Sequence, residues 1–267
     1  MVIVDAQVHP WSRGESTGHH RRSPIDNDVL LQEMAKAGVD RVVLVPPLWD
    51  PDGNSYALAM ARNAPSTFSV MGLLDPAAPD AADRLRRWHE EPGMRGVRFL
   101  LNTPDRLKPL HDGSCDALWP IAEELGITVA MLAPGQLAAV QAIARQHPRL
   151  KLIVDHLAVP RGAVGPSALQ HWPQLLELSQ YANVRVKAVG VGDYALDPFP
   201  FASLKEPLRQ VFDAFGEDRV IWGSDLSRLH HPYVHCVEHF RQHLPFLTGA
   251  ALEKVMGRNI LNLLDWH

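Results

Sequence analysis

The sequence predicts a single α/β domain, a (β/α)8 TIM barrel over residues 1–267. Short runs rich in β-branched residues alternate with stretches of helical periodicity about eight times, and such alternation is typical of parallel strands joined by right-handed crossovers. A chain of 267 residues is also a common size for one such barrel. The main alternative, an open doubly wound sheet, usually has a glycine-rich turn after its first strand, but here that turn reads Val8-His9-Pro10-Trp11.

Each predicted strand is a short apolar run, and each predicted helix has apolar residues at helical spacing. The stretch from Asp26 to Gly38 shows that spacing, Pro46-Pro47 end the second strand, and Gly126 is expected to cap a helix. The predicted strands are residues 2–9, 41–45, 68–74, 96–101, 127–132, 151–157, 184–191 and 220–224. The predicted helices are residues 26–38, 54–63, 80–89, 116–125, 136–146, 167–181, 204–215 and 250–264.

The composition is that of an ordinary globular protein, with 46% hydrophobic and 21% charged residues and a formal net charge of −4. Without basic runs or a long apolar segment, it predicts neither a nucleic-acid nor a membrane partner. Cys115 and Cys236 are isolated in sequence, which favours free thiols in an intracellular protein. With no sign of a secretory leader, we expect a cytoplasmic location. The oligomeric state stays open, because apolar helix faces serve a homo-oligomer as well as a monomer.

Polar residues occupy the ends of several predicted strands. The interior of a barrel is a packed apolar core, so polar residues at these positions indicate a specific role. In the first strand, alternation places Gln7 and His9 at the mouth of the barrel. The two faces predicted for this strand are Val2, Val4, Ala6 and Val8 towards the helices, and Ile3, Asp5, Gln7 and His9 towards the interior.

Three further strands end in, or contain, a residue able to do chemistry: Arg98, His156 and Asp225. Each has an ordinary structural interpretation, as an ion-pair partner, a hydrogen-bonded histidine and a helix cap respectively. However, His9, His156 and Asp225 fall at the same end of the barrel, the end where barrel enzymes carry their active sites. This convergence favours a catalytic role for the three residues.

Four segments resemble the amidohydrolase superfamily, in particular its amidohydrolase-2 branch of lactonases and decarboxylases. They are Val4-Asp5-Ala6-Gln7-Val8-His9, Leu152-Ile153-Val154-Asp155-His156-Leu157, the run from Phe215 to Asp225, and Val255-Met256-Gly257-Arg258-Asn259-Ile260. Their order and spacing extend the resemblance over nearly the whole chain. It implies a barrel hydrolase that acts on a small molecule.

The resemblance also implies a metal site that this sequence lacks in part. Metal-dependent members use His-x-His from strand one, a histidine from strand five and an aspartate from strand eight. Here Gln7 replaces the first histidine, and residues 127–132 contain no imidazole. A neutral amide is a poor ligand for a transition metal. We therefore expect no cofactor. The alternative is a single divalent metal, zinc or manganese, on His9, His156 and Asp225 with a water as fourth ligand.

The pattern resembles those members of the sugar-lactone and 2-pyrone-4,6-dicarboxylate lactone hydrolases that work without a metal. That resemblance implies a small anionic or polyhydroxylated substrate, with Asp225 as the general base, and His156 and His9 as hydrogen-bond donors to the oxyanion. It further implies that Gln7 assists them and that Arg98 and Lys187 bind a substrate carboxylate or hydroxyl. Two alternatives are a metal-dependent hydrolase or decarboxylase of the same fold, and a ligand-binding barrel without catalysis.

The loop after the first strand contains His19, His20, Arg21 and Arg22. A solvated basic loop is the simplest interpretation, and a lid that meets an anionic substrate is the alternative. The sequence leaves the role of this loop open.

Overall fold

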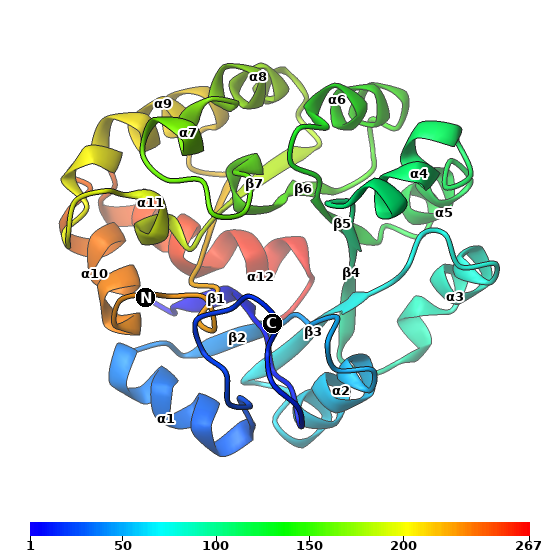
Figure 1. The fold of residues 1–267 in the computed structure, drawn as a ribbon, viewed down its shortest axis with the longest axis horizontal. Coiled ribbons are helices and arrows are strands. Elements are labelled where there is room, and N and C mark those ends of the chain that lie inside the picture. Colours follow the sequence, from blue (N-terminus) through cyan, green and yellow to red (C-terminus); the bar gives the residue numbers. More distant parts are fainter.

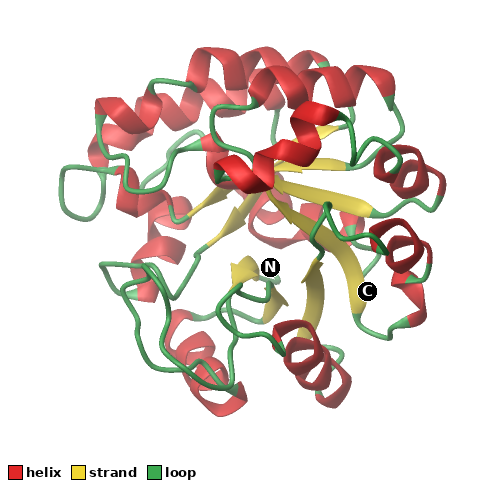
Figure 2. Cartoon of the chain, turned by 45° about the vertical axis from the view of Figure 1, so that its right-hand side comes forward, coloured by secondary structure: helices red, strands yellow, loops and turns green.

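A computed structural model describes residues 1–267 and confirms the single-domain (β/α)8 barrel. Eight parallel strands follow one another around the barrel in chain order, inside a ring of helices (Figures 1 and 2). The strands are β1 Val4–Val8, β2 Arg41–Leu44, β3 Phe68–Leu73, β4 Met94–Leu100, β5 Thr128–Leu132, β6 Leu152–Val154, β7 Val184–Val189 and β8 Val220–Gly223. The helices are α1 Asn27–Ala37, α2 Gly53–Asn63, α3 Ala81–Arg86, α4 Pro104–Asp112, α5 Leu118–Glu124, α6 Leu137–Gln146, α7 Pro166–Leu169, α8 Trp172–Glu177, α9 Lys205–Phe215, α10 Tyr233–Gln242, α11 Gly249–Glu253 and α12 Asn259–Leu263.

The barrel has two apolar cores, because each strand is buried on both faces. The larger core lies between the sheet and the helices. The smaller one fills the barrel interior and includes Val4, Ala6, Ile153 and Ile221. None of the helices has the length and hydropathy that a membrane crossing requires.

The C-terminal segment forms the floor of the barrel. Figure 1 shows α12 lying across the sheet, and the side chains of Ile260 and Leu264 belong to the interior core. Trp266 also belongs to it, and its indole Nε1 donates to the carbonyl of Pro65 over 3.0 Å. This floor closes one end of the barrel and leaves the other end, at the carboxyl ends of the strands, for a cavity.

β1 does not keep the simple alternation that its sequence predicts. Its pairing with β2 shifts in register between Asp5 and Val8, as a β-bulge does. Val4 and Ala6 therefore face the interior, whereas Val8 packs in the outer core. The predictions that Val4 and Ala6 face the helices and that Ile3 faces the interior were wrong for this reason. The bulge nevertheless brings Gln7 and His9 to the site described below.

Asp5 joins β1 to β8 where the barrel closes. Its carboxylate accepts hydrogen bonds from the backbone N–H and the hydroxyl of Ser224 and, over 2.6 Å, from the hydroxyl of Tyr233 in α10. Complete burial raises its pKa, although these donors oppose the effect. Above them, the Asp225 N–H donates to the Gln7 carbonyl over 3.0 Å. The segment that carries Asp225 is thus fixed against β1.

Several boundaries differ from the sequence prediction. The predicted helix 167–181 is interrupted into α7 and α8, each of which has a proline in its first turn. Two helices were not predicted: α4, which contains Pro109, and α10, whose buried residues are interspersed with histidines. β6 ends at Val154, so that His156 lies in a short turn beyond the strand and not on it.

Candidate active site

A cavity of about 1670 Å³ opens at the carboxyl ends of the strands. His9, Arg98, His156 and Asp225, all predicted from the sequence, line it. The cavity therefore lies at the end where barrel enzymes carry their chemistry.

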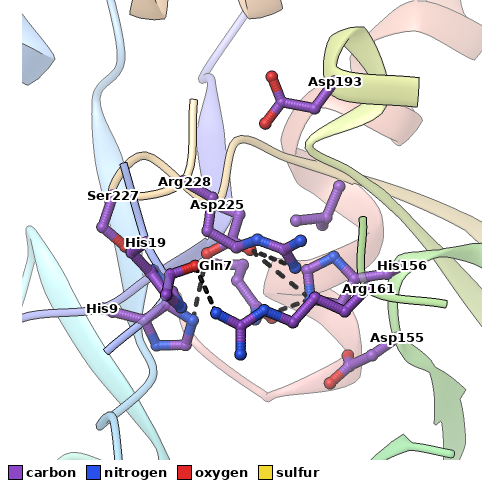
Figure 3. A network of polar contacts seen from close by, with 12 residues as sticks. Gln7, His9, His19, Asp155, His156, Arg161, Asp193, Asp225, Ser227 and Arg228 are labelled. Atoms are coloured by element: carbon purple, nitrogen blue, oxygen red, sulfur yellow. Dashed lines mark hydrogen bonds and ion pairs between the residues drawn. The ribbon is translucent and has the colours of Figure 1, made fainter. Parts of the chain in front are cut away.

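Asp225 is the acidic centre of this cavity and follows β8 by two residues (Figure 3). Its Oδ1 lies 3.1 Å from His9 Nε2, and its Oδ2 lies 3.8 Å from His156 Nε2 and 3.6 Å from Arg228 Nη1. Burial disfavours the charged carboxylate, but His9 and Arg228 outweigh burial and hold the pKa of Asp225 well below its usual range. The carboxylate is thus ionised at neutral pH, as a general base requires.

The backbone of Asp225 is in the left-handed region, with φ of 57°, which is uncommon outside glycine. Such conformations cost free energy and cluster at functional sites. Here the conformation sets the direction in which the carboxylate leaves β8.

His9 is oriented by a backbone group. Its Nδ1 donates to the carbonyl of Val45 over 2.6 Å, because a carbonyl oxygen can only accept. That bond leaves Nε2 as the ring atom that faces Asp225. The carbonyl at the end of β2 therefore fixes which nitrogen of His9 is available to the site.

His156 is a hydrogen-bond acceptor through Nε2. The amide nitrogen of Gln7 lies 3.3 Å from this atom and Nη2 of Arg98 lies 3.5 Å from it, and both groups are donors. Burial lowers the pKa of His156 to about 4, although Asp225 and Asp155 oppose the effect. The ring is thus neutral at pH 7, with its lone pair directed at Gln7 and Arg98.

A buried ion-pair network lies beneath the cavity. Asp155 accepts from Arg98 Nε over 2.7 Å and lies 3.2 Å from Lys187 Nζ, and Lys187 donates to Gln7 Oε1 over 3.1 Å. Burial opposes the charge on Asp155, but Lys187 and Arg98 outweigh burial and lower its pKa. Gln7 and Lys187 are fully buried and do not line the cavity, whereas Arg98 does. Lys187 therefore contacts the residues of the site only indirectly, through Gln7 and Asp155.

The three residues considered as metal ligands do not fit a divalent cation. No group of three or more His, Cys, Asp or Glu side chains is arranged as a metal cluster. The guanidinium of Arg98 faces the free nitrogen of His156, and that of Arg228 faces the carboxylate of Asp225. Two guanidinium charges thus stand beside the atoms that would have to bind the metal, and they oppose a divalent cation there.

The sequence missed several residues that the structure places at this site. Arg228 lies three residues after Asp225, but an arginine in a loop has no distinctive local pattern. Asp155 precedes His156 directly in a segment that was singled out, and this adjacency was a usable signal. His19 was named as part of the basic loop and lines the cavity, but no local pattern indicates its contact with Ser227, 208 residues away in sequence.

We expect the protein to lose stability in acid, because of the buried His156 and His239 and the half-buried His19. Burial is the main cause that lowers the pKa of His19 to about 3 and those of His156 and His239 to about 4. The unfolded chain, with pKa values of about 6.5, binds these protons first, so the stabilisation is complete above pH 6.5 and is lost as the pH falls towards the folded values.

When the pH is lowered from 8 to 5, we expect each of these histidines to reduce the free energy of unfolding by about 1–2 kcal/mol. Urea denaturation at the two pH values measures this change. His239, whose Nδ1 donates to Pro200 outside the active site, provides the control. His239→Gln should reduce the difference in the free energy of unfolding between pH 8 and pH 5 by the contribution of one histidine, about 1–2 kcal/mol. A free energy of unfolding that is equal at pH 8 and pH 5 contradicts the expectation.

The fold and this site together define a barrel hydrolase. A family model described as amidohydrolase matches residues 4–266, and the chain belongs to this family. The resemblance drawn from the four sequence segments is thus confirmed.

Among its relatives, an L-fucono-1,5-lactonase from Burkholderia ambifaria is 32% identical over 240 residues, which cover 85% of this chain and 81% of that protein. An amidohydrolase from Burkholderia multivorans has crystal structures with bound HEPES and with bound zinc. They match with TM-scores of 0.84 and 0.81 at 21% identity, over 100% of both chains. A candidate 2-pyrone-4,6-dicarboxylic acid hydrolase from Pseudomonas putida matches with a TM-score of 0.75 at 22% identity, over 100% of this chain and 98% of that one.

Proposed function

We propose that this protein hydrolyses a lactone of a sugar acid or a dicarboxylate, without a metal, with Asp225 as the general base. The observation that carries the proposal is a buried carboxylate, kept ionised by neighbouring positive charge, at the wall of a large cavity. The L-fucono-1,5-lactonase relative supports the choice of a lactone as substrate.

In the proposed first step, Asp225 takes a proton from a water molecule while the water oxygen attacks the lactone carbonyl carbon. The C=O π bond opens, and negative charge develops on the carbonyl oxygen. In the second step, the carbonyl re-forms as the bond to the ring oxygen breaks, and Asp225 returns its proton to that oxygen. The product is a hydroxy acid, and the enzyme regains its starting charge.

The developing oxyanion is stabilised by Arg98 and His156, which both line the cavity. Nε2 of His156 accepts from Gln7 and Arg98, so the ring proton lies on Nδ1, and this is the proton that His156 can donate. The network beneath holds these groups in place, because Asp155 binds Arg98 and Lys187 binds Gln7. Donors that are already oriented stabilise an oxyanion without reorganisation during the reaction. His9 is assigned to orient Asp225 and to share the negative charge around it.

A lactone also suits this chemistry. The hydrolysis of an ester is easier than that of an amide, so that hydrogen bonds and fixed positive charges can replace the Lewis acid that a metal would supply. The guanidiniums of Arg98 and Arg228 both line the cavity and suit a substrate with carboxylate or hydroxyl groups.

The test is a screen of sugar-acid and dicarboxylate lactones, L-fucono-1,5-lactone included, with and without a chelator, paired with metal analysis of the protein. We expect turnover that the chelator leaves unchanged. A metal held at one per chain and needed for activity would favour the metal-dependent hydrolase or decarboxylase. Tight binding of lactones without turnover would favour a ligand-binding barrel.

A further inference from the structure

The β1–α1 loop, residues 12–24, is an ordered part of the cavity wall. An antiparallel bridge between Trp11 and Ile25, both fully buried, pins its two ends. Within the loop, the hydroxyl of Ser16 donates to the carbonyl of Arg21, and Arg22 donates to the carbonyl of Ser16 over 3.1 Å. These bonds distinguish the loop from a solvated basic segment.

His19 is held in this wall by the segment that carries the proposed base. Its Nδ1 lies 2.7 Å from the hydroxyl of Ser227, and the N–H of Arg21 donates to the Ser227 carbonyl over 2.9 Å. The ring packs edge-on against Trp49 and His9, with centroids 4.7 and 5.3 Å away. Figure 3 shows His19 and Ser227 beside Asp225.

These contacts determine the tautomer of His19. Ser227 is fully buried, and its hydroxyl has no hydrogen-bond partner other than His19. A buried hydroxyl proton needs an acceptor, so that Ser227 donates to Nδ1 and the ring proton of His19 lies on Nε2. No protein group accepts from Nε2, and His19 lines the cavity. Burial lowers the pKa of His19 to about 3, which keeps the ring neutral.

We propose that His19 is a specificity-determining residue whose Nε2–H binds a hydroxyl oxygen of the lactone, with Ser227 as its positioning residue. The proposal rests on the proposed function and assigns to that site a preference for polyhydroxylated lactones. A neutral N–H suits a neutral hydroxyl, whereas the charged substituents of a substrate have Arg98 and Arg228 to bind them. A site built to bind a hydroxyl discriminates strongly against a substrate that lacks it.

The test compares His19→Ala, His19→Gln, Ser227→Ala and the double variant His19→Ala/Ser227→Ala. The substrate is L-fucono-1,5-lactone, or the sugar lactone of the screen that the unmodified enzyme opens fastest. We expect His19→Ala to lower kcat/KM about 10-fold, mainly through KM, because one neutral hydrogen bond is lost. His19→Gln keeps an N–H donor and should recover part of the loss. Ser227→Ala should lower kcat/KM about 3-fold, because a less firmly held His19 loses part of the same hydrogen bond to the substrate.

The double variant separates a positioning role from a structural one. If Ser227 acts only through His19, Ser227→Ala has no further effect once His19 is alanine. Glu15→Ala is the matched control, because Glu15 is exposed in the same loop and makes no hydrogen bond or ion pair. Multiplicative losses in the double variant, or a kcat/KM for His19→Ala within twofold of the unmodified enzyme, would overturn the proposal. Retained turnover of Asp225→Asn on the same lactone would instead overturn the proposed function.

Discussion

Replacement of Asp225 by asparagine is expected to lower kcat for lactone hydrolysis by at least about 10³-fold, since the amide cannot take a proton from water. Two other carboxylates lie near the cavity, and both are engaged: Asp155 is fully buried and bound to Arg98 and Lys187, and Asp193 is paired with His230 and His231. Single-turnover and steady-state rates on the best lactone of the screen measure the loss.

The same substitution is expected to leave the fold intact. Asparagine tolerates the left-handed conformation that Asp225 adopts, and its size is nearly unchanged. Circular dichroism and gel filtration of Asp225→Asn should therefore match the unmodified protein. A folded variant with undiminished turnover would remove Asp225 from the role of general base.

The second large effect is expected on stability, from Asp155→Asn. Asp155 is the shared counter-ion of Arg98 and Lys187, and all three side chains are at least nine-tenths buried. Removal of one member of a buried ion pair leaves an uncompensated buried charge, which costs about 3–5 kcal/mol. For a chain of this size, the melting temperature should fall by roughly 6–20 °C.

A compensating substitution identifies the cause. Lys187→Met in the Asp155→Asn background removes one of the two stranded charges and should restore part of the stability, with a coupling of about 0.5–3 kcal/mol. Asp265→Asn is the control, since Asp265 is exposed and pairs only with His267. Equal losses from Asp155→Asn and Asp265→Asn would show that the buried network contributes nothing to the fold.

The fold class was predictable because it depends on repeated local patterns. Each β-branched run became a strand, and strict alternation with helices defined the parallel order. The bulge in β1 was not predictable, because Val4 to Val8 alternate regularly and the register shift comes from pairing with β2. α10 was missed since His235 and His239 obscured the helical spacing of its buried face.

The site was predictable where residues stand at strand ends. His9, His156 and Asp225 were expected together, and the structure brings the two imidazoles to 3.1 and 3.8 Å from the carboxylate. The direction of the hydrogen bonds was not predictable, since the roles of the His156 nitrogens depend on Gln7 and Arg98.

The floor of the barrel has a consequence for biosynthesis. Val4 and Ala6 leave the ribosome more than 250 residues before Ile260, Leu264 and Trp266, yet these residues complete the interior core in which Val4 and Ala6 lie. Contacts so distant in sequence form late and slowly. A nascent chain without Ile260, Leu264 and Trp266 exposes the apolar interior of the barrel, and such surfaces are prone to aggregation. We therefore expect the barrel to close only after translation of residues 260–266, and this interval is the one in which a chaperone would protect the chain.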